Sequence, residues 1–141
     1  MDKVVGFTCS CFDLLHAGHI LMLKECKDNC DFLIVGLQTD PSIDRQEKSP
    51  PVQSYFERYL QLEAIKYIDK ICPYETEEDL KQLLIYLRPN IRFVGEDWRD
   101  KKFTGKLFSR CSGEIFYNRR YGYSTTNLRR KVWESENGKL D

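Results

Sequence analysis

Short apolar runs alternate along this chain with longer stretches in which apolar residues recur at helical spacing. The short runs are rich in aliphatic and β-branched residues and predict buried strands over residues 3–9, 31–37, 70–74, 91–95 and 113–118. The longer stretches predict helices over residues 19–29, 54–69, 76–87 and 124–133. Strands and helices that alternate in this way are typical of a parallel sheet covered by helices, so we expect an α/β fold.

The second predicted helix carries a clear amphipathic pattern. Ser54 can cap its N-terminus, and Phe56, Leu60, Ala64 and Ile68 follow at intervals of four. Residues four apart lie on the same side of a helix, so we expect this stripe to face the core.

The length of 141 residues suits a single domain with a proper hydrophobic core. A polar, proline-containing loop is predicted over residues 38–53, and no repeat or low-complexity linker divides the chain. We therefore assign residues 1–133 to one domain and expect residues 134–141 to form a polar, frayed C-terminal tail.

The overall charge argues against two classes of partner. Lys and Arg together number 22, as do Asp and Glu, and the pI is about 6.7. Proteins that coat nucleic acid or an acidic membrane usually carry a basic excess, so we expect neither partner. No apolar run approaches the roughly 18 residues of a membrane span, and the first residues lack signal-peptide architecture. We therefore expect a cytoplasmic protein.

Six cysteines are spread along the chain without any C-x-x-C pair, and in a cytosolic protein we expect them to be reduced. Cys9, Cys11, His16 and His19 could in principle bind zinc, although their spacing matches no common ligand pattern. Thiols that fill the core are the favoured interpretation, and we expect no metal site made of protein ligands alone.

Both histidines of the chain, His16 and His19, lie in the segment CFDLLHAGH directly after the first predicted strand. Parallel sheets bind ligands at the carboxyl ends of their strands. Gly18 permits a ligand to approach the main chain, and a helix that begins here favours an anion at its N-terminus. Two imidazoles at that position can donate hydrogen bonds to phosphoryl oxygens, so the segment predicts a phosphate site.

Four segments, taken together, resemble the signatures of the cytidylyltransferase family within the nucleotidyltransferase superfamily. CFDLLHAGH resembles G-T-F-D-x-x-H-x-G-H, and KSPPVQSYFERY resembles K-x-P-P-V…E-E-R. FVGEDW resembles V-x-G-D-D-W, and RRYGYSTT resembles R-T-x-G-I-S-T-T. The order of the four segments is that of the family, and glycerol-3-phosphate cytidylyltransferases are the members that the chain resembles most. The resemblance implies a Rossmann-like parallel sheet with helices on both faces.

The resemblance also implies a reaction. A phosphorylated alcohol, with glycerol 3-phosphate as the best guess, attacks the α-phosphorus of CTP, forming a CDP-alcohol and releasing pyrophosphate. His16, His19 and Arg119 match the catalytic residues of the family, and Lys48 and Arg58 match residues that neutralise substrate charge. Mg²⁺ is expected because a triphosphate carries it. Members of this size are usually homodimers that associate near the histidine turn, so we expect a homodimer.

The resemblance further implies a nucleotide-binding set of residues. Asp97 would accept a hydrogen bond from the exocyclic amine of cytosine, and Ser124 can in addition cap the last helix. Arg129, Arg130 and Lys131 are interpreted as a solvated helix face, and Asp13 as a turn or capping group. The expected nucleotide-binding residues are Ser10, Cys11, Phe12, Gly18, Asp97, Trp98, Gly122, Ser124, Thr125 and Thr126.

Some positions depart from the family pattern. Ser10 and Cys11 stand where the family has Gly-Thr, and Tyr123 replaces its isoleucine. Leu80, with Lys81 beside it, occupies the position where glycerol-phosphate enzymes bring a lysine to the acceptor. We therefore keep phosphoethanolamine or another small phospho-alcohol as an alternative acceptor. An ATP-dependent adenylyltransferase and a non-enzymatic nucleotide-binding domain also remain open, although both histidines and Arg119 favour an enzyme.

Overall fold

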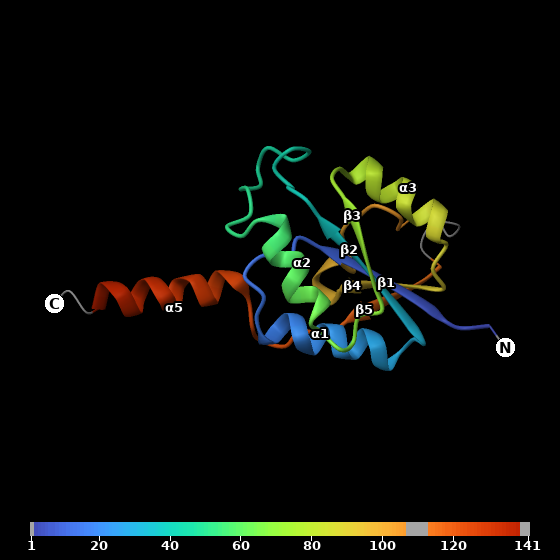
Figure 1. The fold of residues 1–141 in the computed structure, drawn as a ribbon, viewed down its shortest axis with the longest axis horizontal. Coiled ribbons are helices and arrows are strands. Elements are labelled where there is room, and N and C mark those ends of the chain that lie inside the picture. The colour runs from blue at the N-terminus through green and yellow to red at the C-terminus, as the bar shows by residue number, and fades with distance from the viewer. Residues whose placement is uncertain (1, 107–112, 139–141) are drawn as a thin grey trace.

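The computed structural model describes residues 2–106 and 113–138, which form an all-parallel sheet with helices on both faces (Figure 1). The strand order is β3-β2-β1-β4-β5, so the order of strands reverses direction between β1 and β4. This is the Rossmann-like arrangement that was expected, and each predicted strand is confirmed to within two residues. The strands are β1 (Val5–Ser10), β2 (Phe32–Gln38), β3 (Lys70–Tyr74), β4 (Ile91–Gly95) and β5 (Glu114–Asn118).

The helices cover the two faces of the sheet unequally. Leu23 and Cys26 of the first helix and Leu62 of the second pack on one face, whereas Leu80 and Leu84 of the third pack on the other. A short 3-10 helix follows β4, and the last helix follows β5. Their bounds are α1 (Ala17–Asp28), α2 (Tyr55–Glu63), α3 (Glu77–Leu87), η1 (Glu96–Trp98) and α5 (Thr125–Gly138). None of the described helices is long and apolar enough to cross a bilayer.

The predicted apolar stripe of α2 is wrong. Phe56 is 67% exposed and Leu60 is 49% exposed, and the helix ends at Glu63 rather than continuing to residue 69. Arg58 and Leu62 are the buried residues of this helix, so the face that packs on the sheet is turned away from the expected one. The spacing of four shows that Phe56 and Leu60 lie on the same side of the helix. It does not show whether that side faces the core or the solvent.

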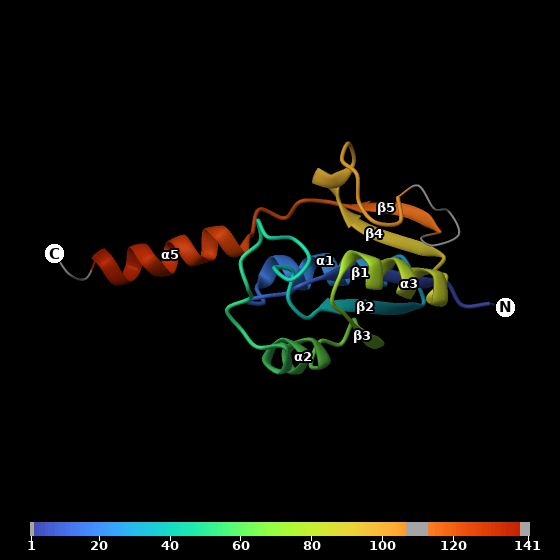
Figure 2. The ribbon, with the colours of Figure 1, turned by 90° about the horizontal axis from the view of Figure 1, so that it is seen from above.

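The last helix departs from the body of the domain. Both views show α5 projecting away from the sheet, and none of its residues is buried (Figure 2). The helix runs to Gly138, so the segment predicted as a polar tail is helical over residues 134–138. Its exposed apolar side chains are Leu128, Val132 and Trp133.

The central strand β1 is paired unequally on its two sides. It pairs with β2 over its full length, from Val5–Phe32 to Ser10–Leu37, but it pairs with β4 only at Gly6–Ile91 and Phe7–Arg92. Beyond those two pairs the strands part toward their carboxyl ends, and a cleft opens at the point where the strand order reverses.

Arg58 ties together the chain segments at the carboxyl edge of the sheet. Its side chain is 1% exposed and donates hydrogen bonds to four carbonyl oxygens, those of Cys11, Gln38, Thr39 and Gln53. These carbonyls follow β1, end β2 and precede α2. One guanidinium therefore fixes three connections that surround the cleft.

We predict that Arg58→Met destabilises the fold by about 3 kcal/mol, because it leaves four inward-facing carbonyls without their charged donor. Urea unfolding monitored by circular dichroism measures the change. Arg130→Met on α5 is the matched control, because that side chain is exposed and makes only an exposed ion pair with Glu134. Equal stabilities of the two variants would show that Arg58 does not hold these connections.

Candidate active site

A cavity of about 730 Å³ occupies the cleft between β1 and β4. Its walls come from both parted strands, from the turn after β1, from the 38–53 loop and from the start of α5. The cavity therefore collects segments from the front, middle and rear of the chain. The expected site residues that line it are Ser10, Cys11, Phe12, His19, Lys48, Trp98 and Thr125.

The two histidines together cap the N-terminus of α1. His16 is the N-cap residue, and its Nδ1 accepts a hydrogen bond from the Gly18 main-chain N–H at 3.0 Å. The Nδ1 of His19 accepts from the His16 N–H at 3.1 Å, and the two ring centroids are 3.9 Å apart. The spacing H-x-x-H thus forms a capping box that orients both rings.

This capping fixes the protonation of both rings. Because each Nδ1 is an acceptor, the neutral ring carries its proton on Nε2 and offers one N–H donor there. Burial lowers the pKa of His19 to about 4, with His16 as a further cause, and burial also lowers the pKa of His16. Both imidazoles are therefore neutral hydrogen-bond donors near pH 7.

The turn that carries the histidines is held in a strained shape. Phe12 and Leu14 have φ values of 51° and 52°, in the left-handed region that non-glycine residues rarely adopt. Asp13 between them accepts hydrogen bonds from the main-chain N–H groups of Val52 and Gln53. The Gln53 side chain accepts from the Leu14 N–H at 2.9 Å. The KSPPVQ segment is thereby fastened to the histidine turn.

The front and rear signatures meet at Gly18. A Cβ placed on this residue would lie 2.8 Å from Cε1 of His16 and 2.9 Å from Cβ of Tyr123. A residue with a side chain would therefore push the rear segment away from the histidine ring. Gly18 was predicted to let a ligand approach the main chain, but in the structure it lets the segment before α5 approach the histidine turn. This contact brings the start of α5 to the same cavity as His19.

Of the expected site residues in the segment 119–126, some line the cavity and others do not. Thr125 lines the cavity, and Ser124 caps α5 by accepting a hydrogen bond from the Asn127 N–H. Gly122 has a φ of 75°, which allows the tight turn before the helix. Arg119 is exposed, and its guanidinium lies over the Tyr121 ring, 5.1 Å from the centroid. Arg119 and the exposed Thr126 are not among the residues that line the cavity.

The expected substrate-binding pair has two different environments. Lys48 is exposed and lines the cavity, as a residue that neutralises ligand charge should. Arg58 is buried and its donors are taken by main-chain carbonyls, so its place in this structure is in the framework below the cavity rather than on a ligand. Of the nucleotide pair on η1, Trp98 lines the cavity, whereas Asp97 is exposed outside it.

Several cavity residues were not anticipated from the sequence. Arg129, which was assigned to a solvated face, forms an ion pair with Asp13 at 3.2 Å. Asp13 does act as the expected turn residue, and it also joins α5 to the histidine turn. Arg45, Glu77 and Arg92 line the cavity as well, and no motif marked them. Only the fold brings these three together, because each comes from a different segment.

The cysteines provide no metal site in the part of the chain that the structure describes. Cys9, Cys11, Cys26, Cys30 and Cys72 are free thiols, and Cys111 lies outside the described residues. No group of three or more His, Cys, Asp or Glu side chains in residues 2–106 and 113–138 could hold a metal ion. The zinc alternative therefore has no support in these residues. Burial raises the pKa of the Cys11 thiol, so it remains protonated near pH 7.

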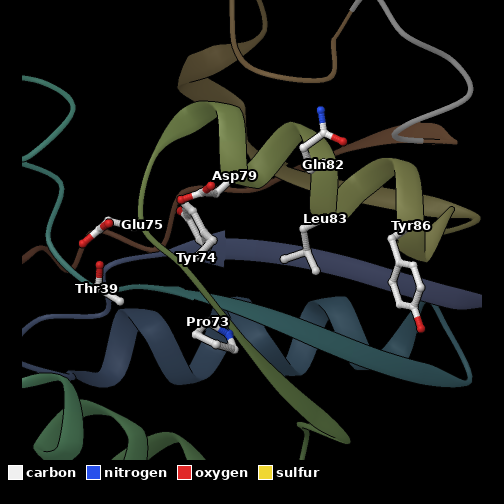
Figure 3. Close-up of a pocket in the computed structure, with 8 residues that line it drawn as sticks. All are labelled: Thr39, Pro73, Tyr74, Glu75, Asp79, Gln82, Leu83 and Tyr86. Atoms are coloured by element: carbon white, nitrogen blue, oxygen red, sulfur yellow. The ribbon is translucent and has the colours of Figure 1, made fainter.

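A second hollow, of about 570 Å³, lies between the end of β3 and α3 (Figure 3). None of the expected site residues lines it. Of its two carboxylates, Glu75 and Asp79, the second is used in the cap of α3, where it accepts a hydrogen bond from the Thr76 N–H. The expected site residues that line either hollow therefore all belong to the first cavity. The lining residues of the second hollow are Thr39, Pro73, Tyr74, Glu75, Asp79, Gln82, Leu83 and Tyr86.

Comparison with known proteins shows which family the chain resembles. The Cytidylyltransferase-like family matches residues 7–131. Glycerol-3-phosphate cytidylyltransferase of Bacillus subtilis (strain 168) is 34% identical over 132 residues, which are 94% of this chain and 98% of that protein. Bifunctional protein HldE of Campylobacter jejuni (strain RM1221) is 37% identical over 133 residues, which are 93% of this chain but only 28% of that protein.

A solved structure supports the same fold. The lipopolysaccharide core biosynthesis protein from Thermoplasma volcanium GSS1 has a TM-score of 0.69 and 26% identity to this chain, and the match covers 87% of this chain and 100% of that one.

We predict that the free energy of unfolding decreases by roughly 1 to 2 kcal/mol when the pH falls from 7 to 5. The pKa of His19 is near 4 in the folded chain and has its ordinary value of 6.5 in the unfolded chain. The unfolded state therefore binds more protons between these values, and the stability present above pH 6.5 is lost as the pH falls toward 4. Urea unfolding at pH 7, 6 and 5 measures the slope, which should be flatter in His19→Asn. An unchanged slope in that variant would contradict a depressed pKa of His19.

Proposed function

This chain belongs to the cytidylyltransferase-like family, and from that premise we propose that it transfers CMP from CTP to a phosphorylated alcohol, with glycerol 3-phosphate as the first candidate. The observation that carries the proposal is the cavity itself, in which His19 from the front of the chain faces Thr125 and Arg129 from its rear. A triphosphate needs hydrogen-bond donors and positive charge, and these segments supply both.

In the proposed reaction, a phosphate oxygen of the acceptor attacks the α-phosphorus of CTP. The bond from the α-phosphorus to the bridging β-oxygen breaks, and pyrophosphate leaves with that oxygen. The Nε2–H groups of His16 and His19 donate to phosphoryl oxygens as charge accumulates around the phosphorus. Neutral donors of this kind need no proton transfer, so positioning and electrostatic stabilisation provide the catalysis.

The remaining residues have supporting roles in this proposal. Lys48 neutralises phosphate charge, and the N-terminus of α5 with Ser124, Thr125 and Thr126 binds the β- and γ-phosphates. Arg119 joins them if its guanidinium turns from Tyr121 toward the bound triphosphate. Trp98 packs beside the cytosine, and Asp97 accepts from its amine. The carboxylate of Asp13 accepts hydrogen bonds from two N–H groups and pairs with Arg129, so it is not available as a ligand for Mg²⁺. In this proposal Mg²⁺ therefore binds together with the triphosphate.

A pyrophosphate-release assay tests the reaction. The protein is incubated with each of the four nucleoside triphosphates, Mg²⁺ and a panel of phospho-alcohols. We expect release only with CTP and at least one phospho-alcohol. Release with ATP alone would identify an adenylyltransferase, and no release with any pair would favour a nucleotide-binding domain without this activity.

We predict that His16→Asn and His19→Asn each lower kcat by about 100-fold or more while the fold persists. Asparagine retains a side-chain acceptor that can cap α1 but lacks the Nε2–H donor. The corresponding alanine variants lose the cap as well and should be about 1 kcal/mol less stable. Steady-state kinetics and thermal unfolding separate the two effects. Near-normal turnover of either asparagine variant would contradict the role given to that histidine.

We also propose that the protein is a homodimer in which the exposed side of α5 is covered by the second copy. Leu128, Val132 and Trp133 are 40%, 57% and 66% exposed, and an isolated helix of 14 residues is marginal in water without packing. The helix starts beside the histidine turn, where the family resemblance places the dimer contact.

Analytical ultracentrifugation tests the dimer. We expect twice the chain mass of 16.7 kDa for the wild type and a single chain mass for Val132→Asp. Ile85→Asp, on the exposed side of α3, serves as a control that adds the same charge away from the histidine turn. A monomeric wild type would refute the proposal.

A further inference from the structure

Three charged residues without a role in the reaction described above line the inner part of the cavity. Arg92 stands on β4 at the last pair with β1, where the strands begin to part. Glu77 is the first residue of α3, and Arg45 comes from the loop that follows β2. We refer to the space lined by Arg45, Glu77, Arg92, Tyr74 and Thr104 as the inner recess.

Arg92 is a buried cation without a counter-ion. Its side chain is 5% exposed, and its guanidinium lies 5.7 Å from the Phe7 ring centroid and 5.5 Å from that of Phe103. It donates to the Thr104 carbonyl at 2.8 Å and approaches the Cys9 sulfur at 3.5 Å, while its Nε is buried and has no partner among the residues that the structure describes. Within residues 2–106 and 113–138, no carboxylate forms an ion pair with Arg92. Burying such a group is costly unless a ligand uses it.

The other groups of the recess mix donors and acceptors. The Nε of Arg45 is also buried without a partner, and its Nη2 lies 3.7 Å from Oε1 of Glu77. The other carboxylate oxygen of Glu77 accepts from the Thr104 hydroxyl at 2.7 Å. Burial raises the pKa of Tyr74, so its phenol stays neutral. Two guanidinium groups, one carboxylate and two hydroxyls therefore surround the same space.

The reaction determines which part of the acceptor can reach this recess. Under the proposed function, on which this inference rests, the acceptor phosphate must lie near the α-phosphorus of CTP, beside the histidine turn. The carbon body of the acceptor then extends deeper into the cavity. Hydroxyl groups both donate and accept, and they match the mixed lining. An ammonium group would meet two guanidinium cations and only one carboxylate.

We infer that the inner recess selects the acceptor, and that the acceptor is a phosphorylated polyol or sugar whose hydroxyl groups bind Arg92, Arg45 and Glu77. Arg92 is the specificity-determining residue, because its buried Nε donor has no partner among the described residues. Phosphoethanolamine and phosphocholine are rejected by charge, and alkyl phosphates are rejected because they leave the guanidinium groups without partners.

Kinetics with matched acceptors test this inference. With CTP fixed, kcat/KM is measured for glycerol 3-phosphate, ribitol 5-phosphate and glucose 1-phosphate, and then for phosphoethanolamine and propyl phosphate. We expect the best polyol or sugar phosphate to exceed the other two by at least about tenfold. Arg92→Met should remove most of that preference, lowering kcat/KM for the polyol about tenfold while KM for CTP and the rate with propyl phosphate change less than about twofold.

Controls distinguish the possible failures. Lys24→Met removes a cation from an exposed ion pair on α1 and should leave the preference intact. If Arg92→Met does not fold, Arg45→Met, in a half-buried position, is expected to reduce the same preference. A wild type that prefers phosphoethanolamine, or a variant that loses activity equally with every acceptor, would overturn the inference while the proposed function stands. No pyrophosphate with any acceptor would instead refute the proposed function itself.

Discussion

The parting of β1 from β4 is the constraint on which the rest of the site depends. A parallel sheet gains main-chain hydrogen bonds when two strands stay paired along their length. The pairing of β1 with β4 nevertheless ends after Gly6 and Phe7. On its other side β1 stays paired with β2 to Ser10, which keeps the strand rigid. The cleft is therefore an opening in an otherwise firm framework, and it occurs where the strand order reverses. Arg58 compensates for the lost pairing by holding the chain segments at the carboxyl edge.

Each imidazole of the histidine turn has one nitrogen that stabilises the fold and one that is available to a ligand. The Nδ1 acceptors of His16 and His19 satisfy main-chain donors at the start of α1, which would otherwise lack partners. The opposite nitrogen of each ring remains for a ligand. A side chain that only capped the helix could be serine or aspartate, and one that only bound phosphate could be lysine. Imidazole can do both, because its two nitrogens can have opposite hydrogen-bonding roles at one pH.

The order of strands and helices could be predicted from the sequence because each element has its own local pattern. The five strands were found as apolar runs, and helix starts were marked by caps such as Ser54 and Thr76. The orientation of α2 could not be found, because Phe56 and Leu60 have the spacing of a core face although they face solvent. The burial of Arg58, which was expected to neutralise substrate charge, and that of Arg92, which no motif marked, could not be found for a related reason. An arginine in a sequence predicts exposure, and only the tertiary structure shows which carbonyls or rings surround it.

Charge shows most clearly why composition limits what a sequence can reveal. The chain as a whole is neutral, but the net charge says nothing about a local site. Among the described residues that line the main cavity, five are Lys or Arg and two are Asp or Glu. The cavity residues Lys48, Lys102 and Arg129 lie on segments far apart in sequence, so the sequence alone could not show that they line one cavity. The Asp13 carboxylate forms an ion pair with Arg129 and accepts hydrogen bonds from the Val52 and Gln53 N–H groups. Its negative charge is therefore balanced by these contacts and orients Arg129. A neutral protein can thus present a positive pocket to a triphosphate, while its acids hold that pocket in shape.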